Sequence, residues 1–473
     1  MKIYLLSQPI IGVFLLLLLI VASYMASTLL AHGSDQPDLQ TKQKSVVLPT
    51  TVDLTEDYKA MGYTDNRKIV RGDDGDLYVA YRKKLKGQYR IFVAKSRDQG
   101  TTWTVLNDNK PVESSGAYTQ RTPSLAIGKT PNGKANYLHL VWYGNDKEHK
   151  GNNRQIKYLR LTTAGKLSTN DCCVSSFTIE GYSGQALWQE HPTIYVNGSN
   201  VYIVWEGRDP DVTSAKIKFV RSTDYGQQWT QPINIVPDPV VNFSRPSLVV
   251  TYVGEQRQLY TVAYGRNASS SQIYWSRSLD NGDTWGNWQT VAPEGGDQRH
   301  VSLARDKAGK VHIVWRQTTS DNRRTVIRYR VYDPALDQGA GGWVAAAQTI
   351  AEHAAQCLFF PSVALGSNDR VWVVWTQSRN CSTMPSDDPT EGQIVYTSKT
   401  LTGQWGNPVV LTSGNTHIYA SLRSAPTPDS DTMDVVWLDM RSCPLDQPNP
   451  NQKEPEADVA ASTGCTIRYT SLK

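Results

Sequence analysis

Short hydrophobic runs recur along the chain, and each ends in an aromatic residue. Seven such runs occur, at residues 77–81, 138–142, 202–205, 259–264, 311–315, 371–375 and 434–437. Their last residues stand 51 to 63 positions apart, and Val, Ile, Tyr and Trp dominate them. These residue types favour strands, and a return at so regular an interval indicates a repeated supersecondary unit.

Each run has a strand-like neighbour on both sides. Before it comes a segment that, in six copies, opens with Pro-Ser-Leu or a close variant, as at residues 123–125 and 246–248. After it comes a third apolar segment, as at 91–95, which leads through a turn toward a fourth. A four-stranded unit cannot bury both of its faces alone, so such units stack radially. We therefore expect an all-β chain folded as a β-propeller of seven four-stranded blades.

The last unit lacks a fourth strand of its own before Lys473. Residues 46–54 (VVLPTTVDL) precede the first unit and have no other partner. We expect this N-terminal strand to complete the last blade, which closes the ring and removes exposed strand edges.

Three of the turns share the pattern S-x-D-x-G-x-x-W, at residues 96–103, 222–229 and 278–285. The Asp side chain can accept hydrogen bonds from turn amides, and Gly permits a positive φ. These aspartates are therefore expected to be structural. The pattern resembles the Asp-box (BNR) repeat of the sialidase-like β-propellers. That family has six blades, so a six-bladed ring is the alternative to the seven units counted here.

The N-terminal segment differs from the rest of the chain. Residues 10–22 are almost wholly apolar, and Lys2 is the only charge before them. We expect residues 1–32 to be a signal anchor or a signal peptide, 33–45 a polar linker and 46–473 the propeller. The chain would then be exported, on the cell surface or secreted, with the N-terminal helix as its only membrane contact.

The six cysteines suit an oxidising compartment, where they would staple loops. Cys357 and Cys381 flank one repeat, and Cys443 and Cys465 fall in one late loop, whereas Cys172 and Cys173 are adjacent and stay unassigned. No C-x-x-C pair or His cluster suggests zinc, so we expect neither a metal nor another cofactor.

The net charge of +5 is too small and too mixed to indicate nucleic-acid binding, so any functional charge must be local. In up-and-down strands, the starts of first strands and the ends of second strands lie at one face of the propeller. The ligand-binding candidates at this mouth are Arg67, Arg121, His191, Arg208, Arg245, Arg266 and Arg299. Guanidinium groups grip carboxylates, sulfates and phosphates in a bidentate manner, so we expect an anionic glycan or another carboxylate-bearing ligand. Alternatively, these residues are solvated loop ends.

The resemblance to sialidases implies a catalytic set, and the chain matches it in part. Arg67, Arg245 and Arg299 resemble the triad that holds the substrate carboxylate, and Tyr419 in IYASL resembles the nucleophile. The loop at 82–87 lacks the acid/base Asp, and the strand at 248–252 lacks the Glu that supports the tyrosine. Tyrosine is a poor nucleophile without such a base.

Three carboxylates of the third unit, Glu190, Glu206 and Asp209, could substitute for the missing catalytic groups. They could equally form an ion-paired rim with Arg208. The leading hypothesis is an exported, membrane-anchored propeller that binds an anionic glycan without efficient hydrolysis. The alternatives are an active exo-sialidase with Tyr419 as nucleophile and a non-enzymatic scaffold for protein interactions. Whether the chain is an enzyme stays open at this stage.

Overall fold

The computed structural model describes a large part of the chain between Leu48 and Lys473. The described residues are 48–63, 67–113, 118–151, 153–163, 174–179 (backbone only), 188–208, 214–235, 242–266, 270–293, 295–319, 324–366, 368–379, 381, 389, 391–423, 432–443 and 464–473. The contacts divide the chain into Met1–Val46 and Val47–Lys473. The expected anchor (1–32) and linker (33–45) lie outside the described residues, which begin at Leu48. Within the described residues, no helix has the length and apolar character needed to cross a membrane.

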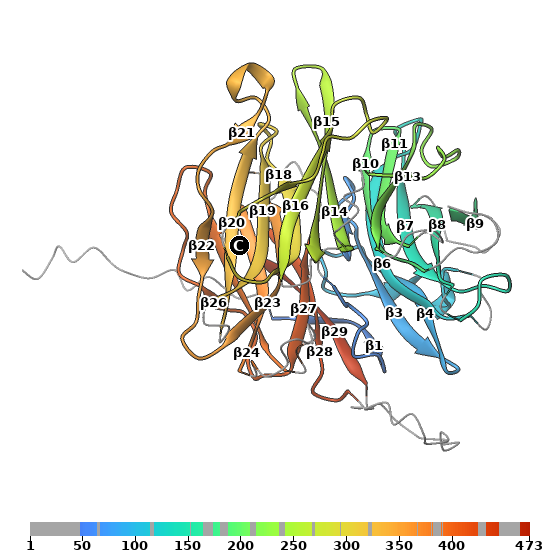
Figure 1. Cartoon of the computed structure of the whole chain (residues 1–473). Helices are drawn as coiled ribbons and strands as arrows, with labels where there is room; N and C mark the ends of the chain where they lie inside the picture. Colours follow the sequence, from blue (N-terminus) through green and yellow to red (C-terminus); the bar gives the residue numbers. More distant parts are fainter. Residues whose placement is uncertain are drawn as a thin grey trace, which may run out of the picture. The chain divides into compact units, whose positions relative to one another are not determined.

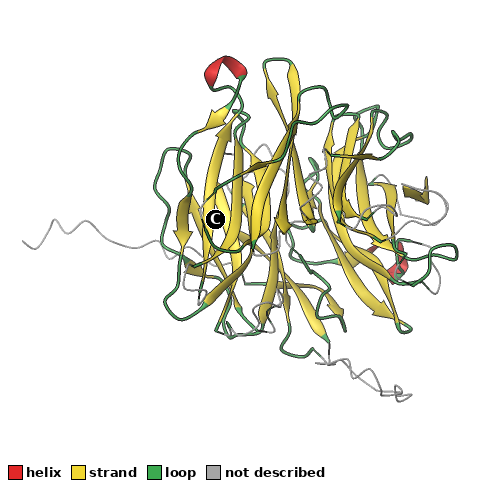
Figure 2. Ribbon diagram, viewed as in Figure 1, coloured by secondary structure: helices red, strands yellow, loops and turns green. Residues whose placement is uncertain are grey.

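The second unit consists of seven antiparallel sheets, which confirms the seven-bladed propeller and excludes six blades (Figures 1 and 2). Blade 1 is β2 (Ile69–Arg71), β3 (Leu77–Leu85), β4 (Gln88–Ser96) and β5 (Thr104–Val105); blade 2 is β6 (Gln120–Lys129), β7 (Asn136–Gly144), β8 (Gln155–Thr162) and β9 (Val174–Ile179); blade 3 is β10 (Gln189–Asn197), β11 (Asn200–Gly207), β12 (Lys216–Ser222) and β13 (Ile233–Asn234). Blade 4 is β14 (Asn242–Val253), β15 (Gln256–Arg266), β16 (Ser271–Ser278) and β17 (Gln289–Thr290); blade 5 is β18 (Gln298–Arg305), β19 (Val311–Thr318), β20 (Thr325–Asp333) and β21 (Gly342–Trp343), with β22 (Gln348–Ala351) also paired to β20. Blade 6 is β23 (Cys357–Leu365), β24 (Val371–Ser378), β25 (Gln393–Lys399) and β26 (Val409–Val410).

Blade 7 confirms the expected closure. Its strand order is β1 (Thr50–Thr55), β29 (Cys465–Leu472), β28 (Met433–Asp439) and β27 (His417–Leu422). The first strand of the described chain pairs with the last, from Thr50 opposite Tyr469 to Thr55 opposite Cys465. In Figure 1 the blue β1 accordingly lies beside the red β29. Two single-turn elements, α2 (Leu106–Asn109) and η1 (Asp337–Gly339), complete the described secondary structure.

The hydrophobic core is divided among the interfaces between blades. Each of the seven buried clusters draws side chains from neighbouring blades, so the interior of one blade is completed by the next. The aromatic residues that end the second strands are part of it, and Trp142 and Trp205 donate to the buried amides of Gln120 and Gln189, both at 2.7 Å. A single blade would leave such surfaces in water, which explains why the repeat is stable only as a ring.

The Asp-box turns have the structural role expected of them. In the first turn, the amide of Gly100 donates to Ser96 Oγ and the amide of Thr102 donates to Asp98 Oδ1, both at 2.8 Å. Ser96 pairs with Leu77 at the start of the second strand, whereas Gln120 pairs with Gly144 at the end of one. The Asp boxes therefore lie at the end of the blades opposite the expected mouth.

Two disulfides join loops to strands. They are Cys357–Cys381 and Cys443–Cys465, so the cysteines expected to staple loops do so. Cys172 and Cys173 lie outside the described residues.

Candidate functional site

The inner strand of a blade, which lies nearest the propeller axis, is its first strand in sequence, or β27 in blade 7. In six blades this strand carries the same backbone irregularity near its start. Each pairing with the second strand shifts register just ahead of the Ser of the Pro-Ser-Leu-like segment, or of Thr193 at the same place in blade 3. The residue two positions before that Ser or Thr has a positive φ of 46–56° in every case: Thr122, His191, Arg245, His300, Phe360 and Tyr419. The bulge lies at the mouth end of each blade, where inner strands converge on the propeller axis.

Tyr63 fills the centre of this ring. Its ring centroid lies 5.0 Å from that of His191, 6.1 Å from Phe360 and 6.3 Å from Tyr419. The guanidinium carbon of Arg245 lies 3.8 Å from the same centroid. These four neighbours belong to blades 3, 6, 7 and 4, so Tyr63 lies over the axis. We call Tyr63, His191, Arg245, Phe360 and Tyr419 the mouth cluster.

His191 and Glu206 form a buried pair beside Tyr63. His191 Nδ1 lies 2.7 Å from Glu206 Oε1, and the other carboxylate oxygen accepts hydrogen bonds from the Ser244 hydroxyl and, at 2.6 Å, from the Arg245 amide. Burial alone would raise the pKa of Glu206, but the charge of His191 and these hydrogen bonds outweigh it and hold that pKa below its ordinary value. Glu206 therefore stays ionised and fixes the orientation of the imidazole.

A cluster of guanidinium groups lies next to this pair. Arg154 forms an ion pair with Glu190, with Nε 2.7 Å from Oε1, and Arg82 forms a buried ion pair with Asp57. Burial lowers the pKa of Arg121, and the positive charges of Arg154 and Arg82 lower it further, against the opposing effects of Tyr143 and Glu190. Among the described residues, no carboxylate accepts a hydrogen bond from Arg121. An anionic ligand would relieve this local excess of positive charge.

The remaining expected arginines lie at the same end, around the mouth cluster. Arg299 Nε lies 2.6 Å from Asp297 Oδ2, and Arg316 lies 3.6 Å from the same carboxylate oxygen and 5.5 Å from the centroid of Phe359. Arg208 follows β11, where its amide donates to Trp188 O at 3.1 Å. Arg266 is exposed at the end of β15.

Arg67 does not belong to the mouth. It is buried within the ring, where its guanidinium donates to the main-chain carbonyl of Val363 at 2.9 Å and also to that of Leu303. Burial lowers its pKa to about 10. It lines a cavity of about 280 Å³ together with Asn197 and Arg305 at the far ends of inner strands. Its place in blade 1 lacks the Pro-Ser-Leu register of the other blades, which is why counting from the repeat misplaced it.

Tyr419 lies in the mouth cluster but has no exposed surface. Its ring packs 5.0 Å from that of Phe360 and against Tyr63, and its amide donates to Thr376 Oγ1 at 3.2 Å. A nucleophile must contact its substrate, so Tyr419 could attack only after Tyr63 moved away. Asp209, the third carboxylate expected to substitute, lies outside the described residues.

Glu190, His191 and Glu206 could also be read as metal ligands, since their ligand atoms lie within 4.8 Å of one another. However, both oxygens of Glu206 already accept hydrogen bonds, and Glu190 is paired with Arg154. A cation would have to displace these donors beside several arginines. The group therefore fits an ion-paired network better than a metal site.

Tyr63 and Arg154 were missed from the sequence because both lie in loops outside the repeat. Arg154 directly precedes the third strand of blade 2, and the starts of third strands lie at the mouth end. That topological rule could have found Arg154. No periodic signal marks Tyr63.

Comparisons with known proteins support the fold. No protein-family model matches the chain, and no curated protein matches it. A solved structure of the polysaccharide lyase Uly1 is similar with a TM-score of 0.50 and 10% identity, covering 92% of this chain and 94% of that chain. An α-L-arabinanase from Penicillium chrysogenum (TM-score 0.45, 15% identity, 76% and 99% covered) and a Hadza microbial sialidase (0.38, 15%, 78% and 62%) are also similar. At 10% identity, the likeness to the lyase shows a shared fold alone.

Proposed function

We propose that the mouth cluster and its arginines bind an acidic sugar unit of a glycan. The observation that carries the proposal is the guanidinium of Arg245 stacked on Tyr63 beside the His191–Glu206 pair. Arg245 and Arg121 would grip the ligand's carboxylate or sulfate, and Tyr63 would pack against its ring. The lyase with this fold acts on a polysaccharide, as its name states, which makes glycans the first ligand class to test.

Binding without sialidase-type hydrolysis fits the geometry better than turnover. Tyr419 is covered by Tyr63 and Phe360, and the carboxylates of Glu190 and Glu206 are held by Arg154 and His191. None of these groups is positioned as an accessible nucleophile with its own base. We also propose that the chain is exported, in keeping with its two disulfides, and is anchored through residues 1–32.

Calorimetric titration of the purified protein with sialylated, uronic-acid and sulfated oligosaccharides tests the proposal. Arg121→Ala should weaken binding about tenfold or more, because a charge-assisted hydrogen bond contributes about 1.5–3 kcal/mol. Tyr63→Ala should also weaken it. Arg97→Ala, an exposed arginine in the first Asp-box turn at the opposite end of the blades, is the matched control and should change nothing.

Affinity should fall as salt rises, because dissolved ions screen the attraction between the arginines and the anionic ligand. Absence of binding to all three classes of oligosaccharide at low salt would contradict the proposal. Release of free sugar that Tyr419→Phe abolishes would instead favour the sialidase alternative.

A further inference from the structure

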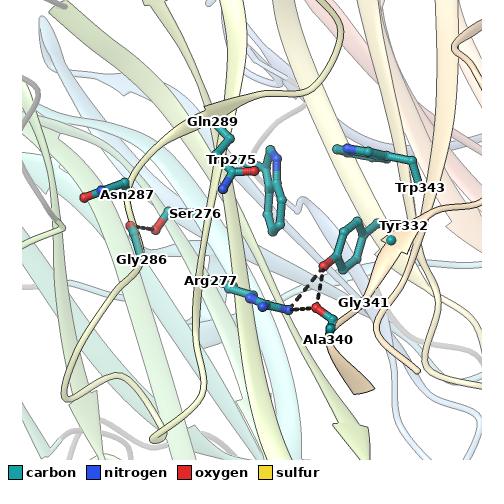
Figure 3. Close-up of a pocket in the computed structure, with 11 residues that line it drawn as sticks. Trp275, Ser276, Arg277, Gly286, Asn287, Gln289, Tyr332, Ala340, Gly341 and Trp343 are labelled. Carbon is teal, nitrogen blue, oxygen red and sulfur yellow. Dashed lines mark hydrogen bonds between the residues drawn. The ribbon is translucent and has the colours of Figure 1, made fainter. Parts of the chain in front are cut away.

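A second pocket lies at the junction of blades 4 and 5, away from the mouth. Its volume is about 430 Å³, within the range of small-ligand sites. Figure 3 shows Trp275, Tyr332 and Trp343 close together, with Arg277 directed at Tyr332 and Ala340. Trp275 and Arg277 lie in the second half of β16, the third strand of blade 4, which places the pocket toward the Asp-box end of the blades.

The pocket is a modified form of a contact that other blade junctions share. The Trp that follows the third strand packs on an aromatic residue in the third strand of the preceding blade. The pairs are Trp103–Tyr469, Trp229–Tyr158, Trp285–Phe219, Trp343–Trp275 and Trp405–Tyr329, with centroids 4.9–5.7 Å apart. In this junction alone, of the five, the receiving aromatic is itself a tryptophan.

Blade 5 also has a longer turn. Tyr332 in blade 5 corresponds to the Asp-box residue Ser278 in blade 4. Ser278 pairs with Leu259 and Tyr332 with Val311, and each of these partners is the first apolar residue of the second strand in its blade. Trp285 follows Ser278 by seven residues, whereas Trp343 follows Tyr332 by eleven. The longer turn carries η1 and the Gly-Gly pair 341–342, and it leaves space between the blades where a compact Asp box would pack.

The walls of this pocket are held rigidly. Arg330 covers one face of Trp343, with its guanidinium carbon 4.2 Å from the ring centroid. Arg277 donates to the Tyr332 hydroxyl at 3.1 Å and to Ala340 O at 2.7 Å. Tyr332 lies 4.8 Å from Trp275. A pre-formed wall of this kind loses little conformational entropy when a ligand binds.

The chemistry of the lining suits an uncharged sugar ring. Two indoles and a phenol offer flat apolar surface, while Arg277, Asn287 and Gln289 offer hydrogen-bonding groups for hydroxyls. Asn287 and Gln289 are exposed; Asn287 lies two residues before β17, and Gln289 is the first residue of that strand. None of the described residues lining the pocket is acidic.

We propose that this pocket binds one uncharged sugar ring of a glycan chain, stacked on Trp343 and hydrogen-bonded by Arg277 and Gln289. The site is independent of the acidic-sugar site, because it lies at the opposite end of the blades and uses other residues. A long glycan that reached both sites would be held with higher avidity than by either one.

Titration with xylo-, cello- and arabino-oligosaccharides, followed by tryptophan fluorescence and saturation-transfer NMR, tests this inference. At least one of the three should bind, and Trp343→Ala should weaken it about tenfold or more, as expected when a central aromatic anchor is removed. Trp405→Ala removes the matching indole of the next junction and should change affinity less than about twofold. Arg121→Ala should leave this binding unchanged, which separates the pocket from the mouth.

If Trp343→Ala does not fold, Gln289→Ala provides a second test of the pocket. Gln289 is exposed, so replacing it should not affect folding. It should weaken binding about threefold to tenfold through the lost hydrogen bond. Absence of binding by all three oligosaccharides, or equal binding by the wild type and both pocket variants, would overturn the inference.

Discussion

A single backbone conformation sets the chemistry of the mouth residue by residue. Six residues share a positive φ at the same inner-strand position, although four of them precede proline, where an extended backbone is normally preferred. For residues other than glycine this conformation costs about 1–2 kcal/mol. Because it recurs in six blades with Thr, His, Arg, Phe and Tyr, it belongs to the fold. The identity of each side chain, rather than the strain, determines what the mouth can bind.

Glu206→Gln tests the buried pair at this scale. We expect the variant to lose about 1–3 kcal/mol of unfolding free energy at pH 7, because it removes a charged acceptor from buried donors. The pKa of Glu206 is depressed, so its contribution is present above the ordinary glutamate pKa and is lost as the pH falls through the folded-state value. Urea denaturation of the wild type and the variant from pH 7 to pH 3 measures the difference in their unfolding free energies. This difference should become smaller as the pH falls. Glu56→Gln, at an exposed position, should have the same unfolding free energy as the wild type.

At the scale of elements, the glycine of each Asp box makes room for the preceding blade. A Cβ at Gly100 would overlap the ring of Tyr469, one at Gly226 that of Tyr158, and one at Gly282 that of Phe219. The first of these contacts joins blade 1 to blade 7 and so completes the ring. The turn is thus a packing device as well as a change of direction.

Gly100→Ala separates the two roles of this glycine. Both Gly100 and Gly87 have a positive φ, of 86° and 76°, but nothing lies within 4 Å of a Cβ at Gly87. Gly87→Ala should therefore cost only the backbone strain of about 1 kcal/mol, whereas Gly100→Ala should cost about 2–4 kcal/mol because overpacking is added. Equal shifts of the two urea midpoints would contradict a role for the glycine in joining blades.

The elements were predictable from the sequence to a much greater extent than the site. The recurring runs that end in an aromatic residue determine the number of blades, and the unpaired segment at 46–54 determines how the ring closes. The up-and-down order of the strands determines which strand ends lie at the same face. The positions of Tyr63, between β1 and β2, and of Arg154, just before β8, depend on loops, which carry no period. Trp343 and Trp405 were also missed, because their turns lack the Ser and Asp of the box and only the packing shows that they are equivalent.

At the scale of the whole molecule, one buried ion network fastens blade 1 to blade 7. Asp434 accepts hydrogen bonds from Arg71 at 2.5 and 2.9 Å, from Arg423 at 2.6 Å and from the Tyr469 hydroxyl at 2.7 Å. Burial would raise the pKa of Asp434, but the hydrogen bond and charge of Arg71 and the charge of Arg423 hold it below its ordinary value. The network lies at the same junction as the β1–β29 pairing.

Asp434→Asn should cost about 3–5 kcal/mol, because it leaves two buried guanidiniums without their counter-charge. The contribution of this depressed carboxyl is complete above the ordinary aspartate pKa and declines as the pH falls through its folded-state value. Urea titration at pH 7 measures the loss, and Asp73→Asn, which breaks a half-exposed pair with Lys129, should lie within about 1 kcal/mol of the wild type. A variant as stable as the wild type would show that the network does not hold the ring closed.

The pairing of β1 with β29 also has a consequence for synthesis. Thr50 leaves the ribosome early, but its partner Tyr469 lies more than 400 residues later. At about 5–20 residues per second, the edge that β1 completes does not exist until roughly 20–80 s after β1 emerges. During translation the first strand therefore has no partner strand at first, and the ring can close only after β29 has left the ribosome.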